Sequence, residues 1–364
     1  MKLRKASALL VLSVAAVTAS GCSASAGGDK AGGGSAGGPA VLRMASTPAE
    51  PSDALPVADF IRRVGVLSGG TVQIQVIDQW GLYAPGAEAR VVRAVAAGQV
   101  DLGWAASRMF DTMGVPAFRA LSAPMLIDSY PLESAVLKTT IPARMLAGLS
   151  RVHVTGLAVL GDALRHPVAV RRPLLGPAGW RGLSMGTNPS GLQEQAIRAL
   201  GAAPVVAFGP NRTHELATGQ IQGFEFDVRR YLHDVVVPGA YLTANVTLWP
   251  QFDVLFANPA RLASFTPQQR AWLRQAAQQA AAGSVSLVAG QDSSSIKKAC
   301  AIGARFAAAT PADLAALRRS FTAVYQNLET DPQTSAFIRQ IQQLKKATLP
   351  GPAPAIPAGC AAAR

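Results

Sequence analysis

Apolar runs of strand length alternate with segments of helical periodicity along most of this chain. In the first half, the pattern predicts buried strands at 41–46, 72–77 and 100–105, and amphipathic helices at 57–67 and 87–97. Strands that alternate with helices indicate an α/β fold with mainly parallel sheets that are covered by helices.

The second half of the chain repeats this alternation. The pattern predicts strands at 152–160, 205–208, 223–228 and 242–248, the last one crossing between lobes, and helices at 189–200, 212–218, 267–283, 314–325 and 334–344. In each half a glycine, Gly98 or Gly219, ends a helix just before a strand, as a left-handed C-terminal residue does. This repeated unit predicts two similar lobes with a ligand cleft between them.

The N-terminal segment has the pattern of an export signal. Basic residues precede an uncharged apolar run at 6–19, which is too short to span a bilayer. The run ends in Ala19-Ser20-Gly21-Cys22, which resembles a bacterial lipobox, so we expect cleavage before Cys22 and acylation of that residue. Ordinary cleavage without a lipid is the alternative. The Gly/Ala/Ser-rich stretch that follows indicates a flexible tether.

The composition limits the partners and the chemistry. The formal net charge is +13, and the basic residues are scattered rather than clustered with aromatic residues. Export and this scatter argue against nucleic acid and leave an anionic surface or anionic solutes as partners. Cys300 and Cys360 form an even pair in an oxidising compartment, so a disulfide between them is our hypothesis. Because the sequence has no Cys/His cluster, we expect no metal and no cofactor.

A series of short motifs resembles one family over roughly 41–282. The motifs are, in chain order, Ser68 to Ile74, Gly98 to Gly103, Ala123 to Leu126, Gly179 to Leu183, Leu200 to Val205 and Gly219 to Glu225. Their order and spacing are similar to those of the DctP-like solute-binding receptors of tripartite ATP-independent periplasmic (TRAP) transporters. The resemblance implies a two-lobed periplasmic-binding-protein-like fold with long C-terminal helices. It also implies a small organic solute, often a carboxylate, held in the cleft, and membrane permease subunits as partners.

Three candidate site residues follow from matches to the family motifs. Arg165 matches an arginine that contacts the ligand in the family, and an inter-strand salt bridge is its alternative role. Glu225 falls in a family motif, although a buried ion pair with an arginine is the expected use. Phe226 stands where the family has an asparagine, and Gly186 stands where the family has a carboxylate-binding arginine. These two departures predict a less polar pocket than is usual in the family.

Three aromatic residues complete the candidate ligand site. Tyr83 and Trp104 lie near the ends of first-lobe strands, where open α/β sheets bind ligands. Trp249 follows the predicted crossing strand, and it either walls the cleft or packs beneath the long helices. Packing in the core is the alternative for all three.

An enzymatic function is not expected. Gly182 to Gly186 matches the Gly-x-Ser-x-Gly motif of α/β-hydrolases, with Ser184 as the nucleophile. A loop precedes this motif, and no histidine follows His233, so a serine hydrolase is a remote alternative. A ligand-sensing or structural envelope lipoprotein with the same fold is the nearer one.

The predicted organisation follows from these elements. The parts are a signal peptide at 1–21, a lipidated tether at 22–40, mainly lobe 1 at 41–160, mainly lobe 2 at 161–265, bracing helices at 266–346 and a Pro/Ala-rich tail at 347–364. The expected location is the outer face of the cell membrane, with the protein exported and held by its lipid.

Overall fold

The computed structural model describes residues 39–48, 53–234, 239–351 and 354–361. The signal peptide, the lipidation site Cys22 and the tether up to residue 38 lie outside the described residues. Within the described ranges, no helix combines the length and the hydropathy that a bilayer span requires.

The described strands form two mixed sheets that share the long strand β4. The first sheet consists, in hydrogen-bonded order, of β2 (Val72–Ile77), β1 (Ala40–Ala45), β3 (Leu102–Ala106), β9 (Trp249–Ala257) and the first part of β4 (Thr155–Val170). The second contains the last part of β4 with β7 (Gly223–Phe226), β5 (Ser184–Thr187), β6 (Ala203–Val206), β8 (Ala240–Thr243) and β10 (Arg305–Ala307). Strand pairs without β4 or β9 are parallel, and these two strands run antiparallel to their neighbours. The α/β fold class expected from the sequence is confirmed.

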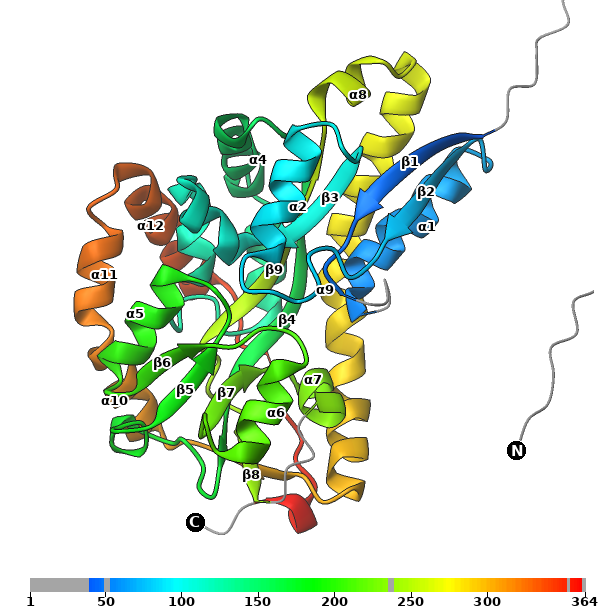
Figure 1. Ribbon diagram of the computed structural model, residues 1–364. Helices are drawn as coiled ribbons and strands as arrows, with labels where there is room; N and C mark the ends of the chain where they lie inside the picture. Colours follow the sequence, from blue (N-terminus) through cyan, green and yellow to red (C-terminus); the bar gives the residue numbers. More distant parts are fainter. Residues whose placement is uncertain (1–38, 49–52, 235–238, 352–353, 362–364) are drawn as a thin grey trace, which may run out of the picture. The chain divides into compact units, whose positions relative to one another are not determined.

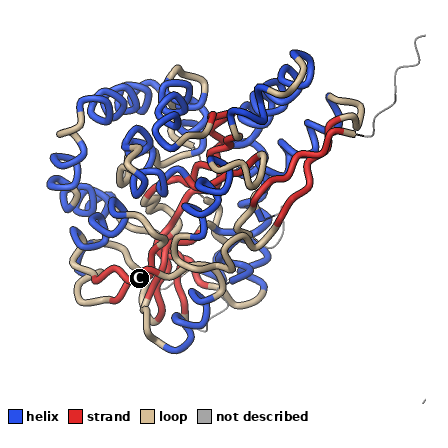
Figure 2. The backbone as a smooth tube through the Cα atoms, turned by 45° about the horizontal axis from the view of Figure 1, so that its top comes forward, coloured by secondary structure: helices blue, strands red, loops and turns tan. Residues whose placement is uncertain are grey.

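Helices cover both sheets (Figure 1). Those before β9 are α1 (Leu55–Leu67), α2 (Ala87–Ala96), α3 (Tyr130–Leu137), α4 (Ile141–Ala147), α5 (Gly191–Ala199), α6 (Asn211–Thr218) and α7 (Val228–Asp234). Those after it are α8 (Pro259–Ala263), α9 (Pro267–Ala301), α10 (Pro311–Ser320), α11 (Thr322–Leu328) and α12 (Pro332–Ala347). Figure 2 shows helices on either side of the strands, with the pair β1 and β2 at one edge.

Helix α9 braces the structure from one sheet to the other. It begins at a capping box, in which the Thr266 hydroxyl accepts a hydrogen bond from the Gln269 N–H and Gln269 Oε1 accepts one from the Thr266 N–H. Along its 35 residues it contacts α1, α3, β4 and α7. One continuous helix therefore supports elements that belong to both sheets.

Most predicted elements are present, but four differ clearly in their boundaries. The strand expected at 152–160 is β4, which continues to Val170. The strand expected at 242–248 ends at Thr243 as β8, and the crossing strand is instead β9, which pairs with β3 as well as β4. The helix predicted at 267–283 continues to Ala301. Helix 314–325 is divided into α10 and α11 at Phe321. The extension of α9 was missed because Gly283, taken as its end, is tolerated inside a helix that packs along its whole length.

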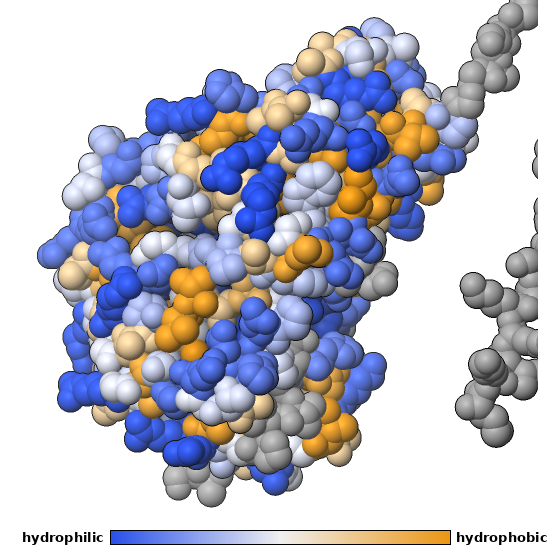
Figure 3. Space-filling view, viewed as in Figure 1, coloured by the Kyte–Doolittle hydropathy of each residue, from blue (hydrophilic) through white to orange (hydrophobic). Residues whose placement is uncertain are grey.

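The core lies between the helices and the two sheets. Its largest fully buried side chains include Trp180, Trp249, Phe60 and Phe256. The face drawn in Figure 3 is mostly hydrophilic, with separate smaller hydrophobic patches. Single apolar residues on a surface are normal and indicate no binding site by themselves.

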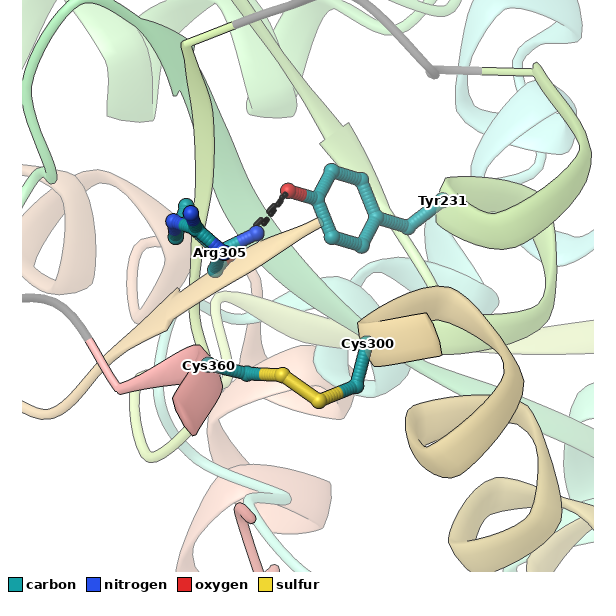
Figure 4. Close-up of a disulfide and its surroundings, with 4 residues drawn as sticks. All are labelled: Tyr231, Cys300, Arg305 and Cys360. Atoms are coloured by element: carbon teal, nitrogen blue, oxygen red, sulfur yellow. Dashed lines mark hydrogen bonds between the residues drawn. A yellow bond between two sulfur atoms is a disulfide. The ribbon is translucent and has the colours of Figure 1, made fainter. Parts of the chain in front are cut away.

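A disulfide joins Cys300 at the end of α9 to Cys360 in the C-terminal tail (Figure 4). The two Cα atoms are 5.6 Å apart, a usual separation for this bond. Next to it, the Tyr231 hydroxyl accepts a hydrogen bond from the Arg305 N–H and donates to the Ala240 carbonyl. The disulfide fixes the tail beside β10, where Ala361 forms a parallel bridge with Phe306.

Candidate ligand-binding site

A cavity of about 380 Å³ lies where the elements of the two sheets meet. Its volume is in the range of small-molecule sites. The described lining residues carry mixed charge, with the arginines Arg108, Arg165, Arg212, Arg229 and Arg230 and the acids Asp53, Glu88, Asp162 and Asp227. The cavity is therefore suited to a polar, charged solute.

Arg165 on β4 lies at the base of this cavity and is only 7% exposed. Its Nη1 is 3.3 Å from Asp227 Oδ2, and its Nε is 3.7 Å from Glu225 Oε2. Burial alone lowers the pKa of Arg165, but the charges of Glu225, Asp227 and Asp162 outweigh this and raise it. Among the described residues, Nη1 has no partner with hydrogen-bond geometry. The guanidinium is thus held charged by the carboxylates beside it, in the lining of the cavity.

A bulge in β4 brings Asp162 and Arg165 into the same cavity. Gly161 pairs with Phe252 and Leu164 pairs with Pro250, so three steps along β4 match two along β9. In a regular strand, residues three apart face opposite sides of the sheet. One extra residue reverses this alternation, and both side chains line the cavity.

Gln251 on β9 connects these two residues. Its Oε1 accepts a hydrogen bond from Arg165 Nη2, and its Nε2 donates to Asp162 Oδ2 at 3.3 Å. The same Nε2 donates to Asp253 Oδ1 at 3.1 Å. The charges on either side fix the orientation of the amide, because its oxygen must face the guanidinium.

Arg108 and Glu88 form a second buried ion pair in the lining. Two hydrogen bonds of 2.9 and 3.1 Å join the guanidinium to the carboxylate, and both side chains are 7% exposed. Arg108 Nη1 also donates to the Pro189 carbonyl at 3.3 Å. Because Glu88 is on α2 and Pro189 precedes α5, this arginine links the first half of the chain to the second across the cavity.

Further contacts join the two sides of the cavity. Arg229 on α7 donates to the Asp53 carbonyl at 2.7 Å, and Arg230 Nη2 is 3.8 Å from Asp53 Oδ1. Tyr83 packs against Gly209, since a Cβ built on this glycine would be 2.6 Å from the Tyr83 Cβ. The walls of the cavity therefore meet through both polar and apolar contacts.

Gly186 stands where the family has an arginine, but the missing side chain leaves no empty space. A Cβ at this position would lie 2.3 Å from the Phe224 ring and 2.6 Å from Ile221. The guanidinium of Arg212 lies 5.3 Å from the Phe224 ring centroid and 5.5 Å from that of Phe226. The aromatic residues thus fill the space beside Gly186 and support a cavity-lining arginine on α6.

The structure brings some of the sequence candidates together and separates others. Arg165, Tyr83 and Trp104 all line the cavity, and Trp104 Nε1 donates to Ser46 at 3.2 Å. Glu225 and Trp249 line only a small recess beside it, of about 10 Å³. Phe226 is fully buried against Phe224 and does not line the cavity.

Sequence reasoning missed several lining residues. Arg108, Arg212, Asp162 and Gln251 gave no signal of periodicity or motif, although Asp162 stands only three residues before Arg165. The period-2 rule for strands places positions 162 and 165 on opposite faces, and only the bulge reverses this. Arg229 and Arg230, which also line the cavity, sit at the start of α7.

Ser184 is not in the setting that a hydrolase nucleophile requires. It begins β5, and Ser184–Thr187 pairs with β6, so the motif is a strand and not a strand-to-helix turn. Its backbone N–H donates to Gln222 at 2.6 Å. The Gly-x-Ser-x-Gly match therefore carries no catalytic geometry.

Two helix-covered sheets that enclose a charged cavity are compatible with a small-ligand-binding protein, and the family comparison specifies the class. The DctP family model, described as bacterial extracellular solute-binding protein family 7, matches residues 53–331. The chain belongs to this family. The family consists of binding proteins for transport and not of enzymes.

Known relatives share this class at low sequence identity. The C4-dicarboxylate-binding periplasmic protein DctP of Rhodobacter capsulatus is 26% identical over 158 residues, which cover 43% of this chain and 46% of that protein. The match therefore spans slightly less than half of the relative's length.

Solved structures agree in fold over most of the chain. A TRAP periplasmic solute-binding protein of Roseobacter denitrificans with bound β-D-glucuronate has a TM-score of 0.73 at 20% identity, covering 85% of this chain and 100% of that one. One from Ralstonia eutropha with bound (S)-2-acetolactate has a TM-score of 0.75 at 19% identity, covering 84% and 99%. One from Sulfurospirillum deleyianum with bound succinate has a TM-score of 0.72 at 18% identity, again covering 84% and 99%.

Proposed function

We propose that this protein captures a small carboxylate-bearing solute in its 380 Å³ cavity and delivers it to the membrane permease subunits of a TRAP-type transporter. The observation that carries the proposal is Arg165 in the cavity lining, which is 7% exposed and is held charged by the neighbouring Glu225 and Asp227. A guanidinium in a partly dehydrated cavity binds a carboxylate strongly and directionally. The solutes in the three structural relatives above are also carboxylates.

Matched acids and neutral compounds test the carboxylate requirement. We expect D-glucuronate, 2-acetolactate or malate to raise the Tm of the purified protein, because a ligand that binds only the folded state stabilises it by mass action. Glucose differs from glucuronate only in having a CH₂OH group in place of the carboxylate, and we expect no shift with it. An equal shift with glucose, or none with any acid, would contradict the proposal.

Delivery to a transporter is tested in the producing cell. Deletion of the gene should abolish high-affinity uptake of the acid that binds in vitro, and the gene for the intact protein should restore it. Normal uptake in the deletion strain would show that this protein does not serve that transporter. Nothing in the described residues favours a ligand-sensing or purely structural role.

We also propose that a lipid on Cys22 holds the protein at the outer face of the membrane. The support is the sequence Ala19 to Cys22 after a short apolar run, followed by a Gly/Ala/Ser-rich tether. Labelled fatty acid should enter the parent protein but not Cys22→Ala, which should be released or remain unprocessed. The proposal fails if neither protein is labelled and both sediment with membranes alike.

A further inference from the structure

A second cavity, of about 240 Å³, lies outside the ligand cavity and shares no described lining residue with it. The beginning of β4, the helix α8 and the first turns of α9 enclose this second cavity. Its described lining contains no acidic residue and combines three leucines, Leu157, Leu262 and Leu273, with two arginines, Arg270 and Arg274. This lining suits a ligand that has both a negative charge and an apolar part.

The two arginines give the second cavity a positive charge that no acid of the described chain balances. Arg270 and Arg274 are four positions apart on α9, so their side chains lie on the same face of the helix. Among the described residues neither arginine forms an ion pair, and the first turn of α9 has no acidic residue. Like charges at this spacing destabilise a helix, and positive charge is unfavourable near a helix N-terminus. An anion bound at both arginines would reduce both penalties.

Local structure holds one arginine in place and leaves the other adaptable. The half-buried Arg270 donates from Nη1 to the carbonyls of Ala263 and Phe265, just after α8, whereas Arg274 is exposed. Leu157 is the extra residue of another bulge in β4, because Gly156 and Ala158 pair with adjacent residues of β9. Bulges re-aim side chains, and here the bulge residue lines the second cavity.

The second cavity lies at the end of the molecule where the folded chain begins. Figure 1 shows α8 at the same end as the start of β1, and Arg261 on α8 donates to the Val41 carbonyl at 3.3 Å. Leu262, the next residue, lines the second cavity. Only residues 23–38 stand between the proposed lipidation site Cys22 and Pro39, which directly precedes β1. A lipid on Cys22 would therefore hold the protein by the end that carries this cavity.

We infer that the second cavity docks an acidic membrane phospholipid, with its phosphate at Arg270 and Arg274 and its apolar part against the three leucines. Arginines beside apolar side chains match the boundary between lipid headgroups and acyl chains. The inference goes beyond solute capture, because it assigns the end of the molecule that rests on the bilayer. Since the two cavities share no described lining residue, this docking leaves the ligand cavity accessible to solute.

Vesicle binding by the mature chain from position 22, carrying Cys22→Ala so that it has no lipid, tests this docking. We expect this parent to co-sediment with vesicles of equal parts phosphatidylglycerol and phosphatidylcholine, and not with phosphatidylcholine alone. Arg274→Gln should weaken binding about fivefold, the usual contribution of one arginine at an anionic surface. The control is Arg319→Gln on α10, which removes the same charge from an exposed arginine outside the second cavity. Its affinity should stay within about twofold of the parent's.

Two further arms test the apolar part and the source of the phosphate. Leu262→Asn replaces a half-buried leucine of the lining and should weaken vesicle binding about threefold or more. Inorganic phosphate, at the same concentration as the lipid phosphate, should leave the binding of the parent unchanged.

Several outcomes would overturn the inference. Equal losses in Arg274→Gln and Arg319→Gln would assign the binding to the net charge of the whole protein. Displacement by inorganic phosphate would identify a site for free anions, and parent-like binding by Leu262→Asn would remove the apolar contact. Absence of binding to the acidic vesicles would also contradict it. If Leu262→Asn does not fold, the two arginine variants decide, and no result of this series bears on solute capture.

Discussion

Tyr83 lies directly against Gly209, so closely that a Cβ at position 209 would be 2.6 Å from both Cβ and Cδ1 of the tyrosine. Gly209 has a φ of +64°, which favours glycine because it brings the Cβ of other residues close to the backbone. Both residues line the cavity but come from different halves of the chain. Their contact therefore sets how closely the two walls approach around a solute.

A methyl group at this contact should weaken solute binding. Gly209→Ala forces the two walls apart and adds about 1–2 kcal/mol of backbone strain, so we expect at least tenfold weaker affinity for the acid that binds the parent. The control is Gly191→Ala at the start of α5, where a Cβ meets nothing within 4 Å. This variant should bind like the parent, as measured by calorimetry. Parent-like affinity of Gly209→Ala would show that the contact opens without cost to binding.

Replacement of Arg165 should remove both a ligand contact and a counter-charge. Arg165→Ala leaves Glu225 and Asp227 buried without their guanidinium, so we expect a lower Tm together with loss of acid binding. Removing one partner of a buried charged pair costs about 2–5 kcal/mol, which corresponds to roughly 30-fold to several thousand-fold in affinity. Arg165→Lys should recover only part of the binding, because the planar fork is lost.

The matched control is an arginine whose ion pair is exposed. Arg198 pairs with Glu194 at 3.0 Å on the surface of α5, and its side chain is 60% exposed. Arg198→Ala should change neither acid affinity nor Tm measurably, because exposed pairs contribute little. Normal acid binding by a folded Arg165→Ala variant would assign Arg165 a purely structural role.

Stability should depend on pH through Asp292. Burial raises the pKa of Asp292 from its ordinary 3.8 to about 7, against the hydrogen bond of 2.8 Å that it accepts from Tyr130. Between these values the folded protein binds more protons than the unfolded chain, so the free energy of unfolding falls as pH rises from about 4 to about 7. We expect the Tm to decrease over this interval by a few degrees on account of this group.

A neutral replacement isolates this effect from other buried acids. Asp292→Asn keeps an oxygen that accepts from Tyr130 but cannot ionise. Its Tm should exceed that of the parent at pH 8 and approach it near pH 4, in scans at several pH values. Parallel Tm curves for the two proteins would show that Asp292 titrates alike in the folded and unfolded states.

The Cys300–Cys360 disulfide should contribute stability without affecting the cavity. The bond closes a loop between residues 60 positions apart, and neither cysteine lines the cavity. The double variant Cys300→Ala/Cys360→Ala should lower the free energy of unfolding by about 2–4 kcal/mol and keep the parent's acid affinity. A reducing agent should lower the Tm of the parent and not that of the variant. Equal sensitivity of both proteins would contradict this assignment.

Much of the fold was predictable because local rules determine it. The strand expected at 72–77 is β2, and the helices expected at 87–97 and 212–218 are α2 and α6 with a boundary shift of one residue. Gly98 and Gly219 have φ of +71° and +78°, as the predicted helix ends require. These features depend on periodicity and capping, which neighbouring residues in the sequence specify.

The candidate site was predictable only in part. Arg165, Tyr83 and Trp104 were identified because they lie at strand ends or within motifs. Asp162 and Gln251 were not, because their place in the cavity depends on a bulge and on the pairing of β4 with β9, which are 94 positions apart at their first residues. No local pattern encodes the register of two such distant strands.

The sequence by itself determined the alternation of strands and helices, the glycine positions where helices end, the export signal pattern and the family. Each of these features depends on residues that lie close together along the chain. The tertiary structure alone decided which charged side chains share the cavity. Asp162 and Arg165 lie on β4, Gln251 on β9 and Arg108 in the 3-10 turn Ser107–Met113, and only the bulged pairing of β4 with β9 and the packing of α2 and α5 bring them together. Burial then sets their charges and hydrogen bonds, because low dielectric makes an unpartnered group costly.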